Sequence, residues 1–308
     1  MISRGVDGLI VDWYSAGSLD QSTQGMKTEI EQHPGFEFAV MPDSGAYSGV
    51  SDPTGKLIDD INYAAQMYFG SPNYMRLNGQ PVVFPFGLEN FPIDWNRVVA
   101  SVNVRPAFIF RNLVGFSSTG SSGAYAWGPD QPLGYWDYFY PNAIPLNKPT
   151  YGSVSKGFDD SLAAWGQHRF TDQQCGQEWL ATFAEANKYY SSSQPLPYMQ
   201  IVTWNDYEEG TAIESGIDNC VNVSAQVTGT QLTWAISGQE NTIDHYTVFV
   251  SEDGVNLANL LDVPAGTRSL DLSQYSLKTT TYSVYVKAVG KASMRNQMSN
   301  AVSYLPSH

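Results

Sequence analysis

Short apolar runs alternate with longer amphipathic stretches over the first two thirds of the chain. Runs rich in β-branched and aromatic residues predict strands at 8–13, 36–41, 81–86, 107–110, 123–127, 150–154 and 198–204. These runs lack a clean alternation of apolar and polar positions, which is typical of strands buried on both faces of a parallel sheet. Between them, the segments 57–69 and 178–190 carry apolar residues at helical spacing and predict helices.

Strands that alternate with helices in this way predict an α/β fold, and we expect a (β/α)8 TIM-type barrel. Seven strand runs are visible where such a barrel has eight, and residues 2–4 resemble the end of a helix that leads into the first run. We therefore expect a barrel that lacks its first strand, with a native start before Met1 and no signal peptide in view. The alternative is a weak eighth strand within 113–118.

After Cys220 the pattern changes to short alternating runs with no helical stretch between them, which predicts an all-β sandwich. The runs lie at 221–227, 231–236, 245–251, 268–272, 281–289 and 301–305. We therefore predict two domains, a (β/α) barrel with the character of a catalytic domain over 1–219 and a β-sandwich over 220–308.

Composition narrows the range of partners. The chain has 308 residues, of which 16 are basic and 30 acidic, and the formal charge of −14 has the wrong sign for binding nucleic acid. No apolar run approaches the ~20 residues that span a bilayer. The 8 Trp and 19 Tyr residues suit sugar binding, and large hydrophobic cores equally. The sequence also predicts no metal site. Cysteines and histidines show no metal-ligand spacing, so we expect no metal and no cofactor. Cys175 and Cys220 either form a disulfide or are two buried thiols.

Candidate chemistry is concentrated at the end of the last predicted strand, in YMQIVTWNDYEEGTAIES. Active sites of barrels lie at the carboxyl ends of strands, and Asp206 and Glu209 follow such an end three residues apart. Glycoside hydrolysis needs two carboxyl groups, one as acid and one as base or nucleophile. The loop must turn for both groups to line one pocket.

This segment resembles a known signature. Trp-Asn-Asp-Tyr-x-Glu at the end of the last strand resembles family 71 glycoside hydrolases, the endo-α-1,3-glucanases, and is similar to the Trp-Asn-Glu-Trp-x-Glu-Gly-Thr signature of family 99 endo-α-mannosidases. GVDGLIVDWY and YMRLNGQPVVFPFG look like earlier parts of family 71, so the resemblance covers about 1–219. One departure is Glu208, which stands where that family usually has Gly. We expect its carboxylate to face solvent.

The resemblance implies an inverting hydrolase of an α-linked polysaccharide in which Asp206 and Glu209 are catalytic, with Glu209 as acid and Asp206 as base. Trp204, Asn205 and Tyr207 match neighbours of this pair and are expected to contact substrate. Glu214 matches a family position, and we expect a structural role for it. The activity implies a secreted or cell-surface protein.

Residues at other strand ends are candidates for substrate binding, because aromatic faces stack on sugar rings and carboxylates accept hydrogen bonds from hydroxyl groups. They are Asp12, Trp13, Tyr14, Asp43, Trp127 and Tyr151. Each ring can instead fill the barrel interior. His168, in the loop after a predicted strand, is a bystander by default.

Two stretches near the C-terminus, QLTWAISGQENTIDHYTVFVSEDG and SLKTTTYSVYVKAVG, resemble fibronectin type III domains. The resemblance gives core roles to Trp234 and Tyr246, and places Leu277 and Tyr282 at a corner one residue shorter than usual. It implies a spacer or binding accessory. Two alternatives to an α-1,3-glucanase stay open, an endo-α-mannosidase-like hydrolase and a non-catalytic carbohydrate-binding protein built on an incomplete barrel.

Overall fold

A computed structural model describes residues 1–306 and separates into two compact units. Unit 1 comprises Met1–Val154 and Thr182–Val202. Unit 2 comprises Ser155–Ala181 and Thr203–His308. The domain boundary expected after residue 219 therefore lies inside unit 2, and the loop with Asp206 and Glu209 belongs to the same unit as the C-terminal strands.

Unit 1 is built on a parallel sheet in the order β1-β2-β4-β5-β6-β7-β10, with the short β3 antiparallel on β4. All pairs along this order are parallel, and each strand coincides with one of the seven predicted runs. The strands are β1 (Gly8–Trp13), β2 (Glu37–Pro42), β3 (Arg76–Leu77), β4 (Gln80–Val83), β5 (Ala107–Arg111), β6 (Ser121–Tyr125), β7 (Thr150–Val154) and β10 (Tyr198–Ile201).

The expectation of a (β/α)8 barrel is wrong. Within residues 1–306, β1 pairs only with β2 and β10 only with β7, so the parallel sheet is an open half-barrel with two ends. Closure needs hydrogen bonds between the first and last strands and a matching strand number, tilt and stagger. The apolar pattern that predicts each strand is local and carries none of that information. Separate antiparallel sheets follow in unit 2, so the chain as a whole is mostly sheet.

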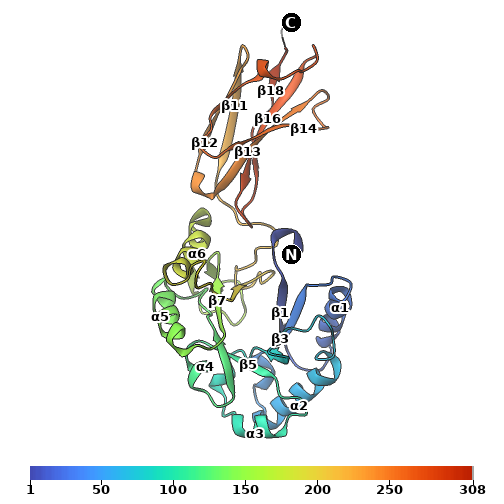
Figure 1. The fold of residues 1–308 in the computed structure, drawn as a ribbon, viewed down its shortest axis with the longest axis vertical. Helices are drawn as coiled ribbons and strands as arrows, with labels where there is room; N and C mark the ends of the chain where they lie inside the picture. The colour runs from blue at the N-terminus through green and yellow to red at the C-terminus, as the bar shows by residue number, and fades with distance from the viewer. Residues whose placement is uncertain (307–308) are drawn as a thin grey trace. The chain divides into compact units, whose positions relative to one another are not determined.

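Helices cover the outer side of the parallel sheet, where Figure 1 shows α1, α2 and α3. In α2, Asp52 caps the first turn by accepting the Gly55 N–H at 2.9 Å, and Leu57, Ile61 and Ala64 are buried against the strands. None of the helices formed by the described residues has the length and apolar character of a membrane span. The helices are α1 (Asp20–Ile30), α2 (Pro53–Met67), α3 (Trp95–Ser101), α4 (Val114–Ser117), α5 (Gly134–Ala143) and α6 (Gln177–Tyr189).

Unit 2 contains two antiparallel sheets, β11-β12-β15 and β14-β13-β16-β17 with β18 on β16. Side chains of both sheets share one core, in which the rings of Trp234 and Tyr246 lie 5.7 Å apart. All six predicted runs form strands here, whereas β14 and the two-residue β17 were not predicted. The strands are β11 (Asn222–Thr228), β12 (Gln231–Ser237), β13 (Ile243–Ser251), β14 (Ala258–Pro264), β15 (Ser269–Asp271), β16 (Tyr282–Gly290), β17 (Gln297–Met298) and β18 (Val302–Tyr304). A separate hairpin pairs β8 (Phe158–Asp159) with β9 (Phe170–Thr171).

A disulfide joins Cys175 to Cys220 and settles the open alternative for these two residues. Nearby, Gln177 and Asn241 exchange side-chain hydrogen bonds of 3.0 and 2.7 Å. The backbone of Ile217 donates to Ser293 O at 2.7 Å and accepts from the Arg295 N–H at 2.9 Å. Covalent and hydrogen bonds thus connect both chain segments of unit 2 to its antiparallel sheets.

Candidate functional site

The loop that follows β10 in the chain, residues 203–214, is held by its own hydrogen bonds. The Ala212 N–H donates to Asp206 O and the Ile213 N–H to Trp204 O, both at 3.0 Å. The hydroxyl oxygens of Thr203 and Thr211 lie 2.7 Å apart across its base. We call this segment the carboxylate loop. Its bonds give it one defined path.

Within the carboxylate loop, Asp206 and Glu209 are joined by a turn. The Glu209 N–H donates to Asp206 Oδ1 at 2.8 Å, and the Asp206 N–H donates to Thr203 Oγ1 at 3.1 Å. Both residues are partly exposed. The chain therefore turns between the two carboxyl groups, and the Asp206 carboxylate stabilises that turn by accepting the Glu209 N–H.

The neighbours of this pair are more exposed. Asn205, Tyr207 and Glu208 face solvent, and Trp204 is partly buried. The Tyr207 hydroxyl donates to the Glu214 carboxylate, and this hydrogen bond raises the pKa of Tyr207. Glu214 thus serves within the loop, as expected from the sequence.

The β8–β9 hairpin supports Glu209 from the other side. The Asp159 N–H donates to Glu209 O at 2.8 Å. Gly210 has a φ of +63°, and a Cβ added to it would lie 3.2 Å from the Asp159 Cβ. The backbone at 209–210 therefore packs directly on the hairpin, which fixes the position of the Glu209 backbone relative to the hairpin.

Unit 1 contributes a second group of candidates at the carboxyl ends of its strands. Asp12 and Tyr14 are exposed, whereas Trp13 between them is 1% exposed, because successive side chains of a strand point to opposite faces. Tyr151 is 2% exposed. Trp13 and Tyr151 therefore belong to the hydrophobic core in this conformation and present no ring face to solvent.

Asp43 follows β2 and is buried, with 7% exposure. It accepts the Gly45 N–H at 2.5 Å and a hydrogen bond from Tyr14. Burial raises the pKa of Asp43, and the two hydrogen bonds and the positive charge of Arg111 only partly oppose that effect. The structure thus brings together Asp43 and Tyr14, which the sequence proposed separately.

Phe86 and Arg111, which lie beside Asp43, and Glu89, which pairs with Arg111, extend this group, and sequence reasoning missed all three. The Arg111 guanidinium lies 4.7 Å from the centre of the Phe86 ring, and the Phe86 ring lies 4.7 Å from that of Trp127. Arg111 Nε also donates to Glu89 at 2.7 Å. Arg111 ends β5, so the strand-end rule that selected Asp43 would have found it. We call Tyr14, Asp43, Phe86, Glu89, Arg111 and Trp127 the strand-end cluster.

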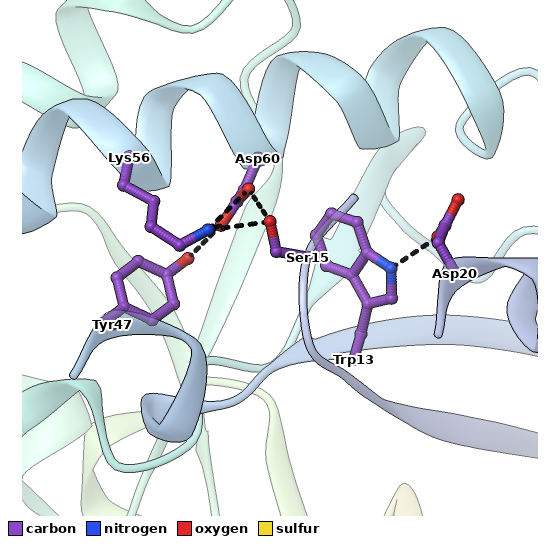
Figure 2. A network of polar contacts seen from close by, with 6 residues as sticks. All are labelled: Trp13, Ser15, Asp20, Tyr47, Lys56 and Asp60. Carbon is purple, nitrogen blue, oxygen red and sulfur yellow. Dashed lines mark hydrogen bonds and ion pairs between the residues drawn. The ribbon is translucent and has the colours of Figure 1, made fainter. Parts of the chain in front are cut away.

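A buried polar network lies beside β1 and has a structural role (Figure 2). Asp60 is 5% exposed and accepts hydrogen bonds from Tyr47 at 2.7 Å, from Lys56 at 2.9 Å and from Ser15. Trp13 Nε1 donates to Asp20 at 2.7 Å. These bonds attach the end of β1 to α1 and α2, and Figure 2 shows the polar atoms of Ser15, Tyr47 and Lys56 directed at Asp60.

Residues 1–306 contain no group of three or more His, Cys, Asp or Glu side chains placed to hold a metal ion.

No protein-family model matches the chain, and no curated protein matches it either. A part is similar to pectate lyase Pel3 from Pectobacterium carotovorum, with 17% identity over 28% of this chain and 27% of that chain and a TM-score of 0.22. Another similar structure is a β-1,2-glucanase from Parabacteroides distasonis, with 16% identity, coverage of 29% and 13%, and a TM-score of 0.22.

An engineered protein aligns with 94% of this chain and 71% of its own at 13% identity and a TM-score of 0.24. The chain spans about a quarter of the length of the pectate lyase that it matches. Similarities at TM-scores this low carry no argument about the function of this chain.

Proposed function

We propose that this protein is a carbohydrate-active enzyme that hydrolyses an α-linked polysaccharide, most specifically α-1,3-glucan. The observation that carries the proposal is the carboxylate loop, in which Asp206 and Glu209 flank one hydrogen-bonded turn and are both partly exposed. Most glycoside hydrolases use a pair of carboxyl groups to cleave the glycosidic bond. The choice of the α-1,3 bond as the bond that is cleaved rests on the resemblance of this segment to family 71.

In the proposed reaction, Glu209 donates a proton to the glycosidic oxygen as the bond to the anomeric carbon breaks. Asp206 accepts a proton from a water molecule whose oxygen attacks that carbon from the opposite face. The products are a new reducing end of inverted configuration and a free hydroxyl on the leaving sugar. Inversion requires the two carboxyl groups to lie roughly 6.5 to 9.5 Å apart when substrate is bound.

The chemistry of the strand-end cluster supports a sugar ligand as well. Tyr14 is 45% exposed, the ring of Trp127 is partly exposed, and the cluster also contains the Asp43 carboxyl group and the Arg111–Glu89 ion pair. Carbohydrate sites combine such ring faces with a few fixed donors and acceptors for hydroxyl groups. In unit 1 we propose Tyr14, Asp43 and Trp127 as substrate contacts, together with the exposed Asp12.

The proposal is tested by the release of new reducing ends from insoluble α-1,3-glucan, with α-mannan and starch assayed in parallel. Asp206→Asn is the informative variant, because its side-chain oxygen can still accept the Glu209 N–H and so keep the turn. We expect release from α-1,3-glucan only, reduced at least about 100-fold in Asp206→Asn and in Glu209→Gln. Release from α-mannan instead would identify an endo-α-mannosidase-like enzyme, and unchanged rates in both variants would refute the catalytic roles.

A second function, sugar binding without hydrolysis, is favoured by one observation. The Asp206 carboxylate already holds the loop by accepting the Glu209 N–H, a role that needs no catalysis. Retention of the chain on α-1,3-glucan without any release of reducing ends, at protein concentrations where the fold is intact, would select this function.

A further inference from the structure

The segment between β8 and β9 is a loop fixed by one buried carboxylate. Asp160 is fully buried, and its two oxygens accept the Arg169 N–H at 2.7 Å, the Gln167 N–H at 3.1 Å and Arg169 Nε at 2.8 Å. A Cβ added to Gly166 would lie 1.9 Å from the Asp160 carbonyl oxygen. The loop thus folds back onto Asp160, which holds it by three hydrogen bonds.

This fixed loop presents large apolar side chains to solvent. The exposed fractions are 85% for Leu162, 53% for Trp165 and 69% for Phe170. Single exposed apolar residues are ordinary on protein surfaces, but Trp is enriched at interaction sites because its ring combines a large apolar face with a polar N–H. Because the loop is already fixed, the Trp165 side chain loses little further conformational entropy when a ligand binds.

The same loop is attached to the proposed catalytic group. Its first strand ends at Asp159, whose N–H donates to Glu209 O at 2.8 Å and against which Gly210 packs. Trp165 precedes Gly166, so its Cα lies within about 8 Å of the Asp160 carbonyl oxygen, given that consecutive Cα atoms are ~3.8 Å apart. All of these residues belong to unit 2. Trp165 therefore lies in the loop that begins directly after Asp159, the residue that is hydrogen-bonded to the carboxylate loop.

We propose that Trp165 is a sugar-stacking residue that holds the polysaccharide chain beside the carboxylate loop. The occupant is a neutral glucan, because the face of a pyranose ring offers C–H groups to an indole. The formal charge of −14 disfavours a phosphate-bearing partner. The location rests on the proposed function, whereas binding itself needs no hydrolysis.

The test measures the affinity of the full chain for α-1,3-glucan by depletion from solution, in the Glu209→Gln background so that the polymer stays intact. We expect Trp165→Ala to bind about tenfold more weakly and Trp165→Phe, which keeps a ring face, to lose no more than about threefold. Leu162→Ala is the matched control, because Leu162 is still more exposed, is apolar and lies in the same loop. Its affinity should equal that of the parent, and thermal unfolding should be the same for all four proteins.

Equal affinity of Trp165→Ala and its parent would overturn the inference, as would an equal loss in Leu162→Ala. Binding to neutral or anionic lipid vesicles in place of glucan would assign the exposed loop to a membrane surface and overturn it too. A chain with Glu209 intact that binds glucan through Trp165 but releases no reducing ends would leave this inference standing while the proposed hydrolysis fails. The two claims are thus separable.

Discussion

Loss of the Cys175–Cys220 disulfide is expected to destabilise unit 2 and to loosen the carboxylate loop. The bond links residues 45 positions apart, and the segment that it closes contains Asp206 and Glu209. In the chain-entropy treatment, opening a loop of this length removes about 4 kcal/mol of stabilisation at 25 °C. For a unit of this size, that corresponds to a fall in Tm of about 10 to 15 °C.

The Cys175→Ser, Cys220→Ser double variant and the wild-type chain, each with and without reductant, provide the assay. Thermal unfolding should show a lower Tm for the double variant and for the reduced wild type, and reductant should not change the variant. Amide hydrogen exchange should accelerate across 203–214 and stay unchanged in β4 and β5 of unit 1. Equal melting of all four samples, or two freely alkylated thiols in the folded wild type, would refute the reasoning.

Two further perturbations address stability. Asp60→Asn removes the negative charge that faces Lys56 in the buried network and should lower the free energy of unfolding of unit 1 by about 2 kcal/mol. Asp52→Asn, at the exposed ion pair with Arg97, should change that free energy by less than about 0.5 kcal/mol. Equal effects of the two variants in urea unfolding would contradict the stabilising role of the buried network. The hydrogen bond from Arg268 lowers the pKa of Glu240 to about 2, so its stabilisation is present above pH ~4.5 and is lost as the pH falls toward 2. Discounted for partial exposure, that stabilisation is about 1 to 2 kcal/mol. Glu240→Gln should abolish this acid-dependent loss while Glu252→Gln keeps it, as measured by urea unfolding between pH 2 and 7.

Local features of the fold were predictable from the sequence. Seven apolar runs located the seven parallel strands, and six alternating runs located most of the C-terminal strands. Closure was not predictable, because it depends on whether β1 meets β10, a contact between segments nearly 190 residues apart. The strand β14 was missed because its run, ANLLDVP, is short and mixes polar residues with apolar ones.

The candidate site was predictable only in part, because local patterns are visible in the sequence and contacts between distant segments are not. The strand-end rule selected Asp43 and Trp127 as candidates, and the pattern of the last run selected Asp206 and Glu209; their roles stay predictions. Alternation along β1 would have separated exposed Tyr14 from buried Trp13. The contacts of Arg111 with Phe86 and of Asp159 with Glu209 join segments distant in sequence, so only the folded chain reveals them.

The assignment of the carboxylate loop to unit 2 changes the role that we expect for the C-terminal strands. The carboxylate loop belongs to unit 2 together with the antiparallel sheets. Immediately after that loop, Ser215 and Ile217 are hydrogen-bonded to Arg295. We therefore expect the C-terminal strands to support the position of the loop rather than to form a detachable spacer.

The central claim, that the carboxylate loop performs hydrolysis, is tested most directly by comparing two adjacent carboxylates. Glu208 is exposed and Glu209 is held by Asp159 and by the turn. On α-1,3-glucan, Glu208→Gln should release reducing ends within about threefold of the wild-type rate, whereas Glu209→Gln should be slower by at least about 100-fold. Equal rates in the two variants, or a larger loss in Glu208→Gln, would contradict the account.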